Sequence, residues 1–467
     1  MPLTQEISIE TIRRNDSVIV PQVPLPLIPV GGRLSFFIQQ WQELGASDWH
    51  ITILSQGLKL NFLQFPALRK HPYCIVLPKD LTRKEVLLQE VSALIDKRAL
   101  EQPLSLDPGV YSHMFTVRKK SGGYRPVIDL KILNQHVRCP TFKMENDVRV
   151  KSQLKQGEWL TSVDLTDAYL HIPIHQDFRK FLRICIAGQV WQFAAMCFGL
   201  NIAPRIFTKM LSPVAAHLRT QGICIHRYLD DWLIRAPSQQ ESVQHTQYVV
   251  NLLTKLGWMI NQQKSDLVPS QQITFLGMYI DLEAGFLAPT QEKIDKILLW
   301  SQFLHKSTVI SVQQYLSLLG LLNNVSSLVK LGRLHLRPLQ LYLASFGLDL
   351  RASLYDTIPL RPVFFTALMW WEHPEKLARG VELRTPPTQM TMFTDASRSG
   401  WGASILTHSA KGKWNHLDKQ NHISVLELRA VRLGLQALHH LVTGKCIRVM
   451  SDNVATIAYI RNEGGTR

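Results

Sequence analysis

Residues 226–234 read HRYLDDWLI, which sets two acidic residues between apolar runs in a chain of 467 residues and formal net charge +16. Apolar side chains alternate before Asp230 and Asp231 and continue after them, so two short strands joined by a tight turn are predicted. Because aspartate is a common turn residue, a solvated acidic turn is one interpretation of this tip. A pair of metal ligands is the other, and this short stretch alone does not decide between them.

A third acid, Asp164, ends the buried strand pattern of residues 160–165 within the sequence SVDLTDAY. If this strand lies beside the hairpin of residues 223–234, the three carboxylates converge. Buried like charges repel one another and are costly unless a cation neutralises them. Mg²⁺, with Mn²⁺ as the alternative, takes hard oxygen ligands and keeps coordination places for phosphate oxygens. Two such ions stabilise the attacking and leaving oxygens of a phosphoryl transfer, so two metal ions per site are expected.

The composition narrows the class of protein. Against 52 lysines and arginines stand 36 aspartates and glutamates, and the sequence pI is about 9.6. This basic excess favours polyanionic partners, nucleic acid first and anionic membrane second. The apolar fraction of 46% is typical of a globular chain, whose length predicts more than one core. Since no signal peptide or run of ~18 apolar residues is found, we expect a soluble, intracellular protein, cytoplasmic or nuclear and not secreted.

The six cysteines are scattered, at positions 74, 139, 185, 197, 224 and 446. None forms a C-x-x-C pair, which argues against a zinc module and against a disulfide framework. This distribution fits a reducing compartment.

Composition and periodicity divide the chain into five parts. Residues 1–35 are polar and then proline-rich, as in a tail or linker, and residues 36–105 carry apolar and aromatic patches that suggest a small element packed on something larger. Residues 106–285 hold hairpin, strand and helix patterns, and residues 286–385 are mainly helical. Residues 386–467 follow a proline-rich break and read strand, strand, strand, helix, strand, helix.

Several elements are predicted within the third part. A basic hairpin turns around residues 121–123, and two strand patterns cover residues 159–174 and 181–196. Pro204 is a favourable first residue of a helix whose apolar positions recur at helical spacing. These positions are Phe207, Met210, Leu211, Val214 and Leu218.

Four motifs, in order and spacing, resemble the palm motifs of reverse transcriptases over about residues 107–285: SVDLTDAYLHIPI, FGLNIAPRIF, YLDD and FLGMYIDLEAGFL. Within that group, VYSHMFTVRKKSGGYRPVIDLKILNQHV and HRYLDDWLI look most like DIRS-type retrotransposons, the tyrosine-recombinase retroelements. Gypsy-type elements and retroviruses are more distant matches. The resemblance implies an α+β multidomain fold, with a right-hand polymerase of fingers, palm and thumb. A connection and a truncated ribonuclease H-like α/β domain would follow.

The resemblance also implies roles for residues of this chain. Asp164, Asp230 and Asp231 would be the polymerase metal ligands. Lys264 would be a general acid that protonates the departing pyrophosphate. Phe275, Leu276 and Gly277 match the element that positions the primer end.

Other matched residues would bind the incoming deoxynucleotide. Lys119 and Arg125 would clamp its triphosphate, or else belong to a solvated basic hairpin. Asp167 and Ala168 would offer backbone N–H groups. Tyr169 would be a steric gate against a ribose 2′-hydroxyl, or else an ordinary strand aromatic. Phe198 and Gly199 match the start of a helix that faces the template and the nucleotide.

The C-terminal part carries a second set of acids, Asp395, Glu427 and Asp452. Their order along the strands and helix resembles ribonuclease H, which uses two metal ions to cleave RNA in an RNA–DNA hybrid. Each acid has a structural alternative, because Ser424 with Glu427 matches a capping box and Asp452 with Asn453 can cap a helix. The family's fourth acid is missing before Arg467, so we expect a truncated domain that cuts hybrids poorly.

The leading hypothesis is an RNA-directed DNA polymerase with an attached, incomplete ribonuclease H. Its partners would be an RNA template, a DNA primer and product, an RNA–DNA hybrid and dNTPs. One alternative is a non-catalytic nucleic-acid-binding remnant of a retrotransposon. Another is a palm polymerase that makes RNA, which Tyr169 and the C-terminal acids argue against. The basic helical run with Lys330, Arg333 and Arg337 is a candidate for duplex backbone contacts, whereas Trp370 and Trp371 are expected in a core.

Overall fold

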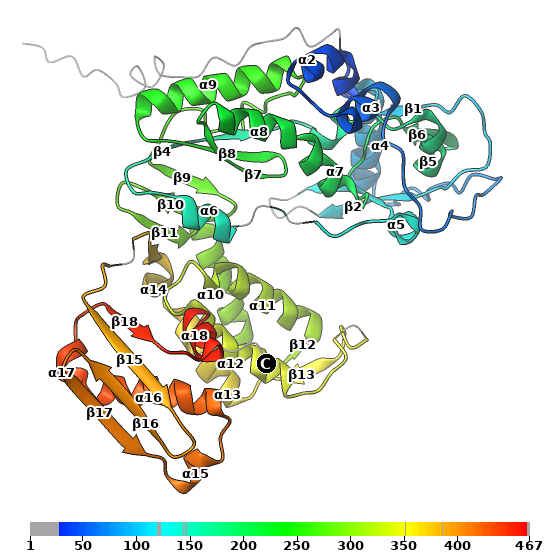
Figure 1. Ribbon diagram of the computed structural model, residues 1–467. Helices are drawn as coiled ribbons and strands as arrows, with labels where there is room; N and C mark the ends of the chain where they lie inside the picture. Colours follow the sequence, from blue (N-terminus) through cyan, green and yellow to red (C-terminus); the bar gives the residue numbers. More distant parts are fainter. Residues whose placement is uncertain are drawn as a thin grey trace, which may run out of the picture. The chain divides into compact units, whose positions relative to one another are not determined.

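The computed structural model describes residues 28–118, 123–142, 144, 147–350, 352–384 and 386–464. The chain forms two compact units, Met1–Ile273 and Thr274–Arg467. Helices and strands occur in both units, which gives each an α+β composition (Figure 1). None of the helices in these ranges is both long enough and apolar enough to span a bilayer.

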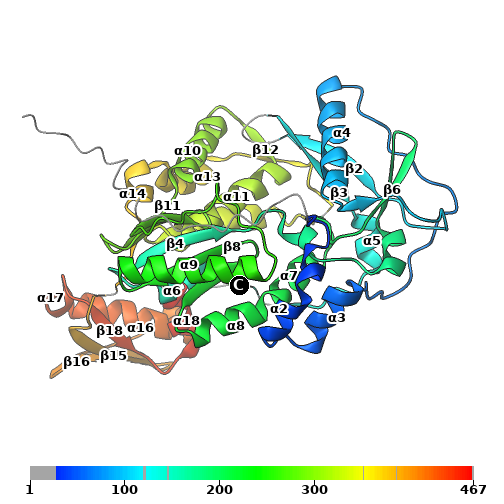
Figure 2. The ribbon, with the colours of Figure 1, turned by 90° about the horizontal axis from the view of Figure 1, so that it is seen from above.

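A three-stranded antiparallel sheet, which we call the central sheet, organises the first unit in the order β4-β8-β7. Its strands are β4 (Trp159–Asp164), β8 (Asp231–Ala236) and β7 (Cys224–Tyr228). Helix α9 (Gln239–Lys255) packs across β4 and β8, and this contact buries the apolar residues of both strands (Figure 1 and Figure 2). The predicted strand and hairpin are therefore sheet neighbours, and Asp164 lies opposite Asp231 in the register.

Helix α9 begins where the sequence supplies a capping residue. Ser238 is the N-cap, and its side chain accepts a hydrogen bond from the Glu241 backbone N–H. This bond satisfies one of the amides that a helix start leaves unpaired. Thr246 on the same helix is fully buried and lies 2.6 Å from the Thr161 hydroxyl of β4. The pair fixes the helix on the sheet with a polar contact inside an apolar interface.

The predicted basic hairpin is also present, as β2 (His113–Arg118) and β3 (Tyr124–Asp129). Helix α4 (Leu81–Asp96) packs against both strands, and the Asp80 side chain caps it by accepting from the Arg83 N–H. The short helices α5 (Lys131–His136) and α6 (Asp147–Gln153) follow the hairpin.

The two long strand patterns are shorter in the structure than predicted. The first ends at Asp164, and its continuation forms the 3-10 helix η2 (Ala168–His171) after Asp167 adopts φ +49°. The second becomes a hairpin of β5 (Arg183–Ile186) and β6 (Gln189–Phe193), which pairs with β1 (Leu100–Glu101). Apolar residues resume after each turn, so alternation in the sequence did not reveal where the strands end. The 3-10 helix η3 (Gln176–Phe181) lies between the two patterns.

The helix predicted near Pro204 is present but divided at Leu211. Helix α7 (Ala203–Met210) and helix α8 (Ser212–Thr220) each have a proline in the first turn. The five apolar positions predicted for the buried face are all in the core. The helical period was therefore correct, and the break follows from Pro213, which cannot donate to the preceding turn.

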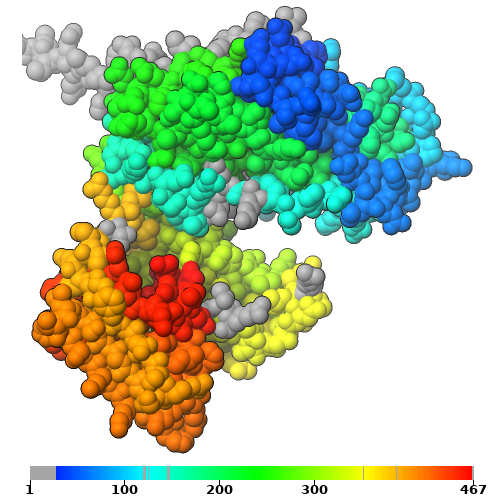
Figure 3. Space-filling view, in the orientation of Figure 1, coloured from blue at the N-terminus to red at the C-terminus, as the bar shows by residue number. Residues whose placement is uncertain are grey.

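Residues 33–56 form three short helical segments, which we call the N-terminal helices: η1 (Arg33–Phe37), α2 (Ile38–Glu43) and α3 (Asp48–Gln56). The Trp41 indole N–H donates to the Leu256 carbonyl at 3.0 Å, and the Arg33 Nε–H donates to the Gly257 carbonyl at 2.9 Å. Both side chains are buried, so these helices are part of the first unit. In the space-filling view the blue N-terminal residues cover one end of the green body (Figure 3).

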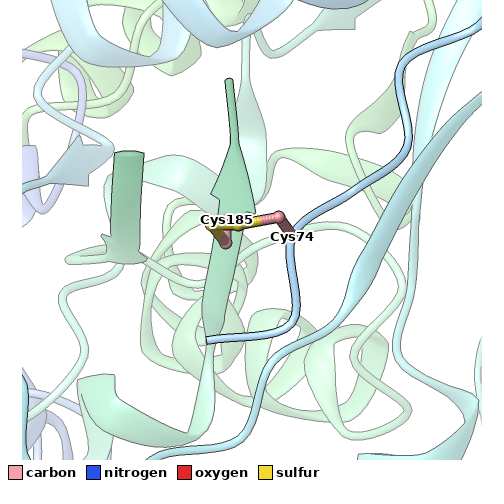
Figure 4. The surroundings of a disulfide bond; sticks show 2 residues. All are labelled: Cys74 and Cys185. Atoms are coloured by element: carbon pink, nitrogen blue, oxygen red, sulfur yellow. A yellow bond between two sulfur atoms is a disulfide. The ribbon is translucent and has the colours of Figure 1, made fainter. Parts of the chain in front are cut away.

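The prediction that the scattered cysteines form no disulfide framework is wrong for one pair, Cys74 and Cys185. A parallel β-bridge pairs Cys74 with Cys185, and the structure joins the two in a disulfide (Figure 4). The Ile75 N–H donates to the Cys185 carbonyl at 2.7 Å, which fixes the extended segment on β5. The pairing was not visible in the sequence because 111 residues separate the two cysteines.

The second unit begins with a four-stranded sheet in the order β14-β11-β10-β9. The strands are β9 (Gln272–Phe275), β10 (Met278–Asp281), β11 (Phe286–Pro289) and β14 (Val381–Glu382). The predicted helical region follows as α10 (Gln291–His305), α11 (Val312–Ser326), α12 (Gly332–Ala344), α13 (Pro362–Leu368), η4 (Met369–Glu372) and α14 (Pro374–Ala378), with a small sheet of β12 (Val309–Ser311) and β13 (Thr357–Pro359). As expected for a core residue, Trp371 is fully buried, whereas Trp370 is half-buried and stacks on His335.

The last part of the unit is built on a four-stranded sheet, which we call the C-terminal sheet, in the order β17-β16-β15-β18. Its strands are β15 (Met390–Ala396), β16 (Gly400–Ile405), β17 (His408–Lys413) and β18 (Ile447–Met450). The helices of this part are α15 (His416–Lys419), α16 (Ile423–Ala437), α17 (His439–Val442) and α18 (Val454–Arg461). Strand β18 runs parallel to β15, and α16 packs on β15 and β16. Gly434 allows this approach, since a Cβ there would lie 2.5 Å from the Ala403 Cβ.

The N-terminal helices give a first testable prediction. We expect Trp41→Ala to lower the free energy of unfolding of the first unit by about 3–5 kcal/mol, because the ring is fully buried and its N–H is hydrogen-bonded. Urea denaturation followed by circular dichroism measures the change. The control is Phe36→Ala, which removes a ring that is 60% exposed and should cost less than about 1 kcal/mol. Equal unfolding midpoints for the two variants would show that these helices do not belong to the cooperative core.

Candidate active site

The register of the central sheet brings three carboxylates to one edge. Asp164 is the last residue of β4, and Asp231, its partner in the register, is the first residue of β8. Asp230 lies in the two-residue turn that joins the paired residues Tyr228 and Asp231. The Leu165 N–H donates to the Asp230 carbonyl at 3.2 Å, which ties this turn to the end of β4.

The turn contains an unusual backbone conformation. Leu229 has φ +56°, a region that residues with a Cβ rarely adopt. Such a conformation costs on the order of 1–3 kcal/mol and persists when the surrounding structure enforces it. Here the two strands that flank the turn are paired with each other up to its ends. This pairing enforces the conformation of Leu229 and holds Asp230 at the tip of the hairpin.

Burial and mutual repulsion perturb these acids. Burial raises the pKa of Asp231 to about 6, with further increases from the charges of Asp230 and Asp164. The pKa of Asp230 is raised as well, first by burial and then by Asp164. Carboxylate oxygens are suitable ligands for Mg²⁺ or Mn²⁺, so these three half-buried acids are a candidate site for a hard cation.

A loop after α9 supports Asp164 from the other side. The Asp164 N–H donates to the Ser265 hydroxyl at 2.9 Å, and the Asn261 N–H donates to the Asp164 carbonyl at 2.9 Å. The Ser265 hydroxyl in turn donates to the Asn261 carbonyl at 2.7 Å. Sequence reasoning missed Asn261 and Ser265, because their role depends on a spatial neighbour about a hundred residues earlier.

Lys264 lies on this loop and is exposed. Its positive charge opposes the increase in the pKa of Asp230 and of Asp231, so the ammonium group is close enough to act on these two carboxylates. The loop thus brings the predicted general acid to the same site as the predicted metal ligands. A mobile cation at this place can transfer a proton to a phosphate oxygen held beside the acids.

The turn after β4 presents backbone amides. Asp167 is the N-cap of η2 and Ala168 is its first residue, and the first amides of a helical turn lack acceptors within the helix. The Asp167 carboxylate pairs with the Lys97 ammonium at 2.9 Å. Lys97 was not anticipated, and it fixes a residue that sits in the left-handed region.

Tyr169 forms a wall of the same region. Its side chain is 8% exposed and packs against Phe198 and Phe207, with ring centroids 4.9 Å and 5.3 Å away. Burial, with the nearby charge of Asp230, raises the pKa of Tyr169 to about 12, so the phenol stays neutral. The ring is therefore a rigid, uncharged surface beside the carboxylates.

Phe198 and Gly199 lie in a turn before α7 and not at the start of the helix, as the resemblance implied. Gly199 has φ +92°, and a Cβ there would lie 3.0 Å from the Ile128 carbonyl oxygen. The Asn134 side chain holds this turn by donating to the Gly199 carbonyl at 2.8 Å and accepting from the Asn201 N–H at 2.9 Å. Asn134 is a further supporting residue that the sequence did not reveal.

For two predicted groups, a place beside the three carboxylates stays a prediction. Lys119 lies outside the described residues, and Arg125 is placed only by its backbone in β3, opposite Val117. Of the residues predicted to position the primer, Phe275 is the last residue of β9, and Leu276 and Gly277 form the turn to β10, in the second unit. Leu276 and Gly277 both have positive φ, and the Gly277 carbonyl accepts from Lys293 at 2.8 Å.

A second carboxylate cluster lies at the edge of the C-terminal sheet. One carboxylate oxygen of each of Asp395, Glu427 and Asp452 lies within 4.8 Å of the others, and no other group in the described ranges of the chain is as tight. Parallel pairing of β15 with β18 aligns their carboxyl ends, so Asp395 and Asp452 meet. The palm-like acids of the central sheet are less tightly grouped.

Glu427 lies beneath these two exposed acids on α16 and is 3% exposed. One of its oxygens accepts from the Ala396 N–H at 3.2 Å, and the other has no hydrogen-bond partner among the described residues. Its pKa is raised, mainly by burial, then by Asp395 and Asp452. The predicted capping box is wrong, because His422 and not Ser424 is the N-cap of α16. Asn453 does cap α18, which leaves Asp452 free of that role.

Comparison with known proteins places this geometry in context. Residues 117–280 match the family model described as reverse transcriptase (RNA-dependent DNA polymerase). The Tf2-7 and Tf2-3 transposon polyproteins of Schizosaccharomyces pombe (strain 972 / ATCC 24843) are each 32% identical over 187 residues. These residues are 40% of this chain, which covers 14% of the length of each polyprotein.

Two solved structures share the fold. The foamy viral protease-reverse transcriptase in complex with dsDNA gives a TM-score of 0.59 at 16% identity and covers 93% of this chain and 92% of its own. The same kind of protein in complex with an RNA/DNA hybrid gives a TM-score of 0.55 at 16% identity, over 91% of this chain and 58% of that one. The α+β fold expected from the sequence is therefore shared with these foamy viral structures.

The raised pKa of Asp231 gives a prediction for the metal-free chain. Its unfolded value is 3.8 and its folded value about 6, so stability from this group is present below pH ~4 and is lost as pH rises through 6. The shift corresponds to about 3 kcal/mol, which we reduce to about 1–2 because the group is half-exposed to solvent. We expect Asp231→Asn to be more stable than wild type by this amount at pH 8 in EDTA, and equal to it near pH 4.

Urea unfolding at several pH values measures this difference. The matched control is Asp177→Asn, whose side chain is 80% exposed and whose midpoint should follow wild type at every pH. Mg²⁺ should stabilise the wild type and leave Asp231→Asn unchanged. A variant that is less stable than wild type at pH 8 would mean that the carboxylates do not repel one another.

Proposed function

We propose that this chain, whose residues 117–280 form a reverse transcriptase domain, is an RNA-directed DNA polymerase of a retrotransposon. The observation that carries the proposal is the opposition of Asp164 and Asp231 in one register, with Asp230 in the adjoining turn. All three acids lie within the matched residues. The DIRS-type assignment rests on the quoted motifs.

In the proposed reaction the three carboxylates would hold two Mg²⁺ ions, which would supply positive charge for the attacking 3′-oxygen of the primer and for the phosphate oxygens of the incoming dNTP. The chain contributes the rest of the site. The amides of Asp167 and Ala168 would donate to the triphosphate, and Lys264 would give a proton to the departing pyrophosphate. The Tyr169 ring, fixed between Phe198 and Phe207, would exclude a ribose 2′-hydroxyl by its bulk.

The partners follow from the same proposal. The net charge of +16 favours a polyanionic template and primer, and the related solved structures are complexes with dsDNA and with an RNA/DNA hybrid. We therefore assign an RNA template, a DNA primer, their hybrid and dNTPs to this chain. We place the chain inside the cell, in the cytoplasm or nucleus, where these substrates occur.

We further propose that Asp395, Glu427 and Asp452 form a ribonuclease H centre that acts on RNA in an RNA–DNA hybrid. The tight grouping of their oxygens and the unpaired, buried oxygen of Glu427 support a site for divalent metal. Bound metal would activate the attacking water. The hydrogen bond from the Ala396 N–H would keep the Glu427 carboxylate in place.

Primer extension tests the polymerase proposal. With an RNA template, a DNA primer, dNTPs and Mg²⁺, we expect wild type to extend the primer and Asp230→Asn to lose at least ~100-fold in rate, because a metal ligand is missing. The control Asp177→Asn, a carboxylate far from any metal role, should extend normally. Binding of the primer–template by wild type without extension would favour the non-catalytic remnant instead.

Hybrid cleavage tests the second centre separately. Any cleavage of a labelled RNA–DNA hybrid should fall to background in Glu427→Gln, because the buried carboxylate is lost while primer extension is kept. The isosteric control Glu375→Gln changes an exposed acid outside the C-terminal sheet and should leave cleavage unchanged. Manganese binding measured by electron paramagnetic resonance gives a readout without catalysis: equal binding by wild type and Glu427→Gln would count against a metal centre here.

A further inference from the structure

A groove in the first unit lies between α3, α7 and the segments around Lys59 and Arg138. Its volume is about 460 Å³, within the range of ligand sites in proteins. Buried aliphatic side chains form the floor: Ile53, Ile202 and Ile206. None of the residues that line this groove takes part in the proposed polymerase or nuclease reaction.

The rim of the groove carries only one sign of charge. Four basic side chains line it, and no acidic residue does so in the part of the chain that the structure describes. They are Lys59, Arg138, Arg205 and Lys209. A concentration of like charge around an apolar floor costs free energy in the absence of a ligand, so the groove is complementary to an anion with apolar parts.

Two of these cations are held close together. Arg205 and Lys209 are four residues apart on α7, a spacing that places them on one face of the helix. The Lys209 ammonium lies over the Trp49 ring, 3.8 Å from its centroid, which fixes it at the wall of the groove. The pKa of Lys209 is lowered, first by burial and then by Arg205, as expected for neighbouring charges that repel.

Contacts between the N-terminal helices and the rest of the first unit build the groove. A ring nitrogen of His50 on α3 hydrogen-bonds with the Lys209 carbonyl at 3.1 Å. At the end of α3, Gly57 has φ +89°, and a Cβ there would lie 2.4 Å from the His175 nitrogen. The next residue, Leu58, donates its N–H to the Pro173 carbonyl at 2.7 Å. The walls are therefore fixed before any ligand binds.

Helix α7 separates this groove from the carboxylate site. Arg205 and Ile206 line the groove, while the next residue, Phe207, contacts Tyr169. An α-helix with its side chains is about 10 Å across. A nucleic-acid strand can therefore pass from the groove to the nucleotide site over the width of one helix.

From this geometry we propose that the groove binds an unpaired nucleic-acid strand, the segment of template that has not yet been copied. Phosphates would contact the four cations, and a base would lie on the aliphatic floor, a combination that single-strand sites use without reading sequence. The template role rests on the proposed polymerase function, whereas binding of a single strand does not. The N-terminal helices would then serve to hold the template as well as to complete the core.

Fluorescence anisotropy with the full chain tests the proposal. The probes are a labelled duplex with a ten-nucleotide 5′ template overhang and the same duplex with a blunt end. We expect Arg205→Gln/Lys209→Gln to bind the overhang duplex about tenfold more weakly and the blunt duplex as wild type does. The salt dependence for the overhang duplex should also become less steep, by a slope of about 1.4 for two lost phosphate contacts.

Two controls make the result specific. The charge-matched variant Lys79→Gln/Lys155→Gln removes two exposed cations outside the groove and should bind both duplexes as wild type does. Circular dichroism and thermal unfolding check that both double variants are folded, and Lys209→Glu alone provides a second groove variant with the same expected direction. Equal weakening for blunt and overhang duplexes, or none for either, would overturn the proposal.

A competition arm separates a strand from free phosphate. Inorganic tripolyphosphate, at a phosphate concentration equal to that of the oligonucleotide, should not displace a labelled single-stranded RNA. Displacement would identify the groove as a site for free polyphosphate and overturn the strand proposal. Binding of single-stranded RNA that is lost in Arg205→Gln/Lys209→Gln supports the groove even if wild type fails to extend a primer, in which case only the template role falls.

Discussion

Repulsion among carboxylates that the backbone forces together is the constraint on which the first unit depends. Burial and this repulsion raise the pKa of Asp231 to about 6, a shift that corresponds to about 1–2 kcal/mol once solvent exposure is allowed for. The cost is built into the register of β4 with β8, because Asp164 and Asp231 cannot separate without shifting every pair along the strands. A divalent cation bound there would relieve this repulsion, and its binding would then stabilise the fold.

Long-range hydrogen bonds hold the irregular backbone segments around this site. Several backbone groups of the site region are fixed by residues from distant parts of the sequence: Ser265 fixes Asp164, and Asn134 fixes the turn at Gly199. The N-terminal helices act in the same way on α7 and on the segment after α9, through His50 and Trp41. The chain thus uses long-range hydrogen bonds to keep short, irregular segments in place, while the sheet itself provides the rigid base.

Sequence patterns were informative where periodicity or a motif is local. Alternation identified β4 and the β7–β8 hairpin, and helical spacing identified the buried face of α7 and α8. The pairing of Cys74 with Cys185 was missed because it depends on which segments lie side by side in space, whereas the His422 cap is a local contact that the capping-box pattern did not indicate. Lys97, Asn134, Asn261 and Ser265 could not be assigned because each contacts a group far away in the sequence, Asn261 through its backbone and the others through their side chains.

The Lys97–Asp167 ion pair has a mechanical consequence. Lys97 immediately follows α4, and α4 packs on both strands of the β2–β3 hairpin. Asp167 starts the turn that leads to Tyr169. One ion pair therefore links the β2–β3 hairpin, through α4, to the turn that carries Tyr169, so that a displacement of α4 would act on both segments.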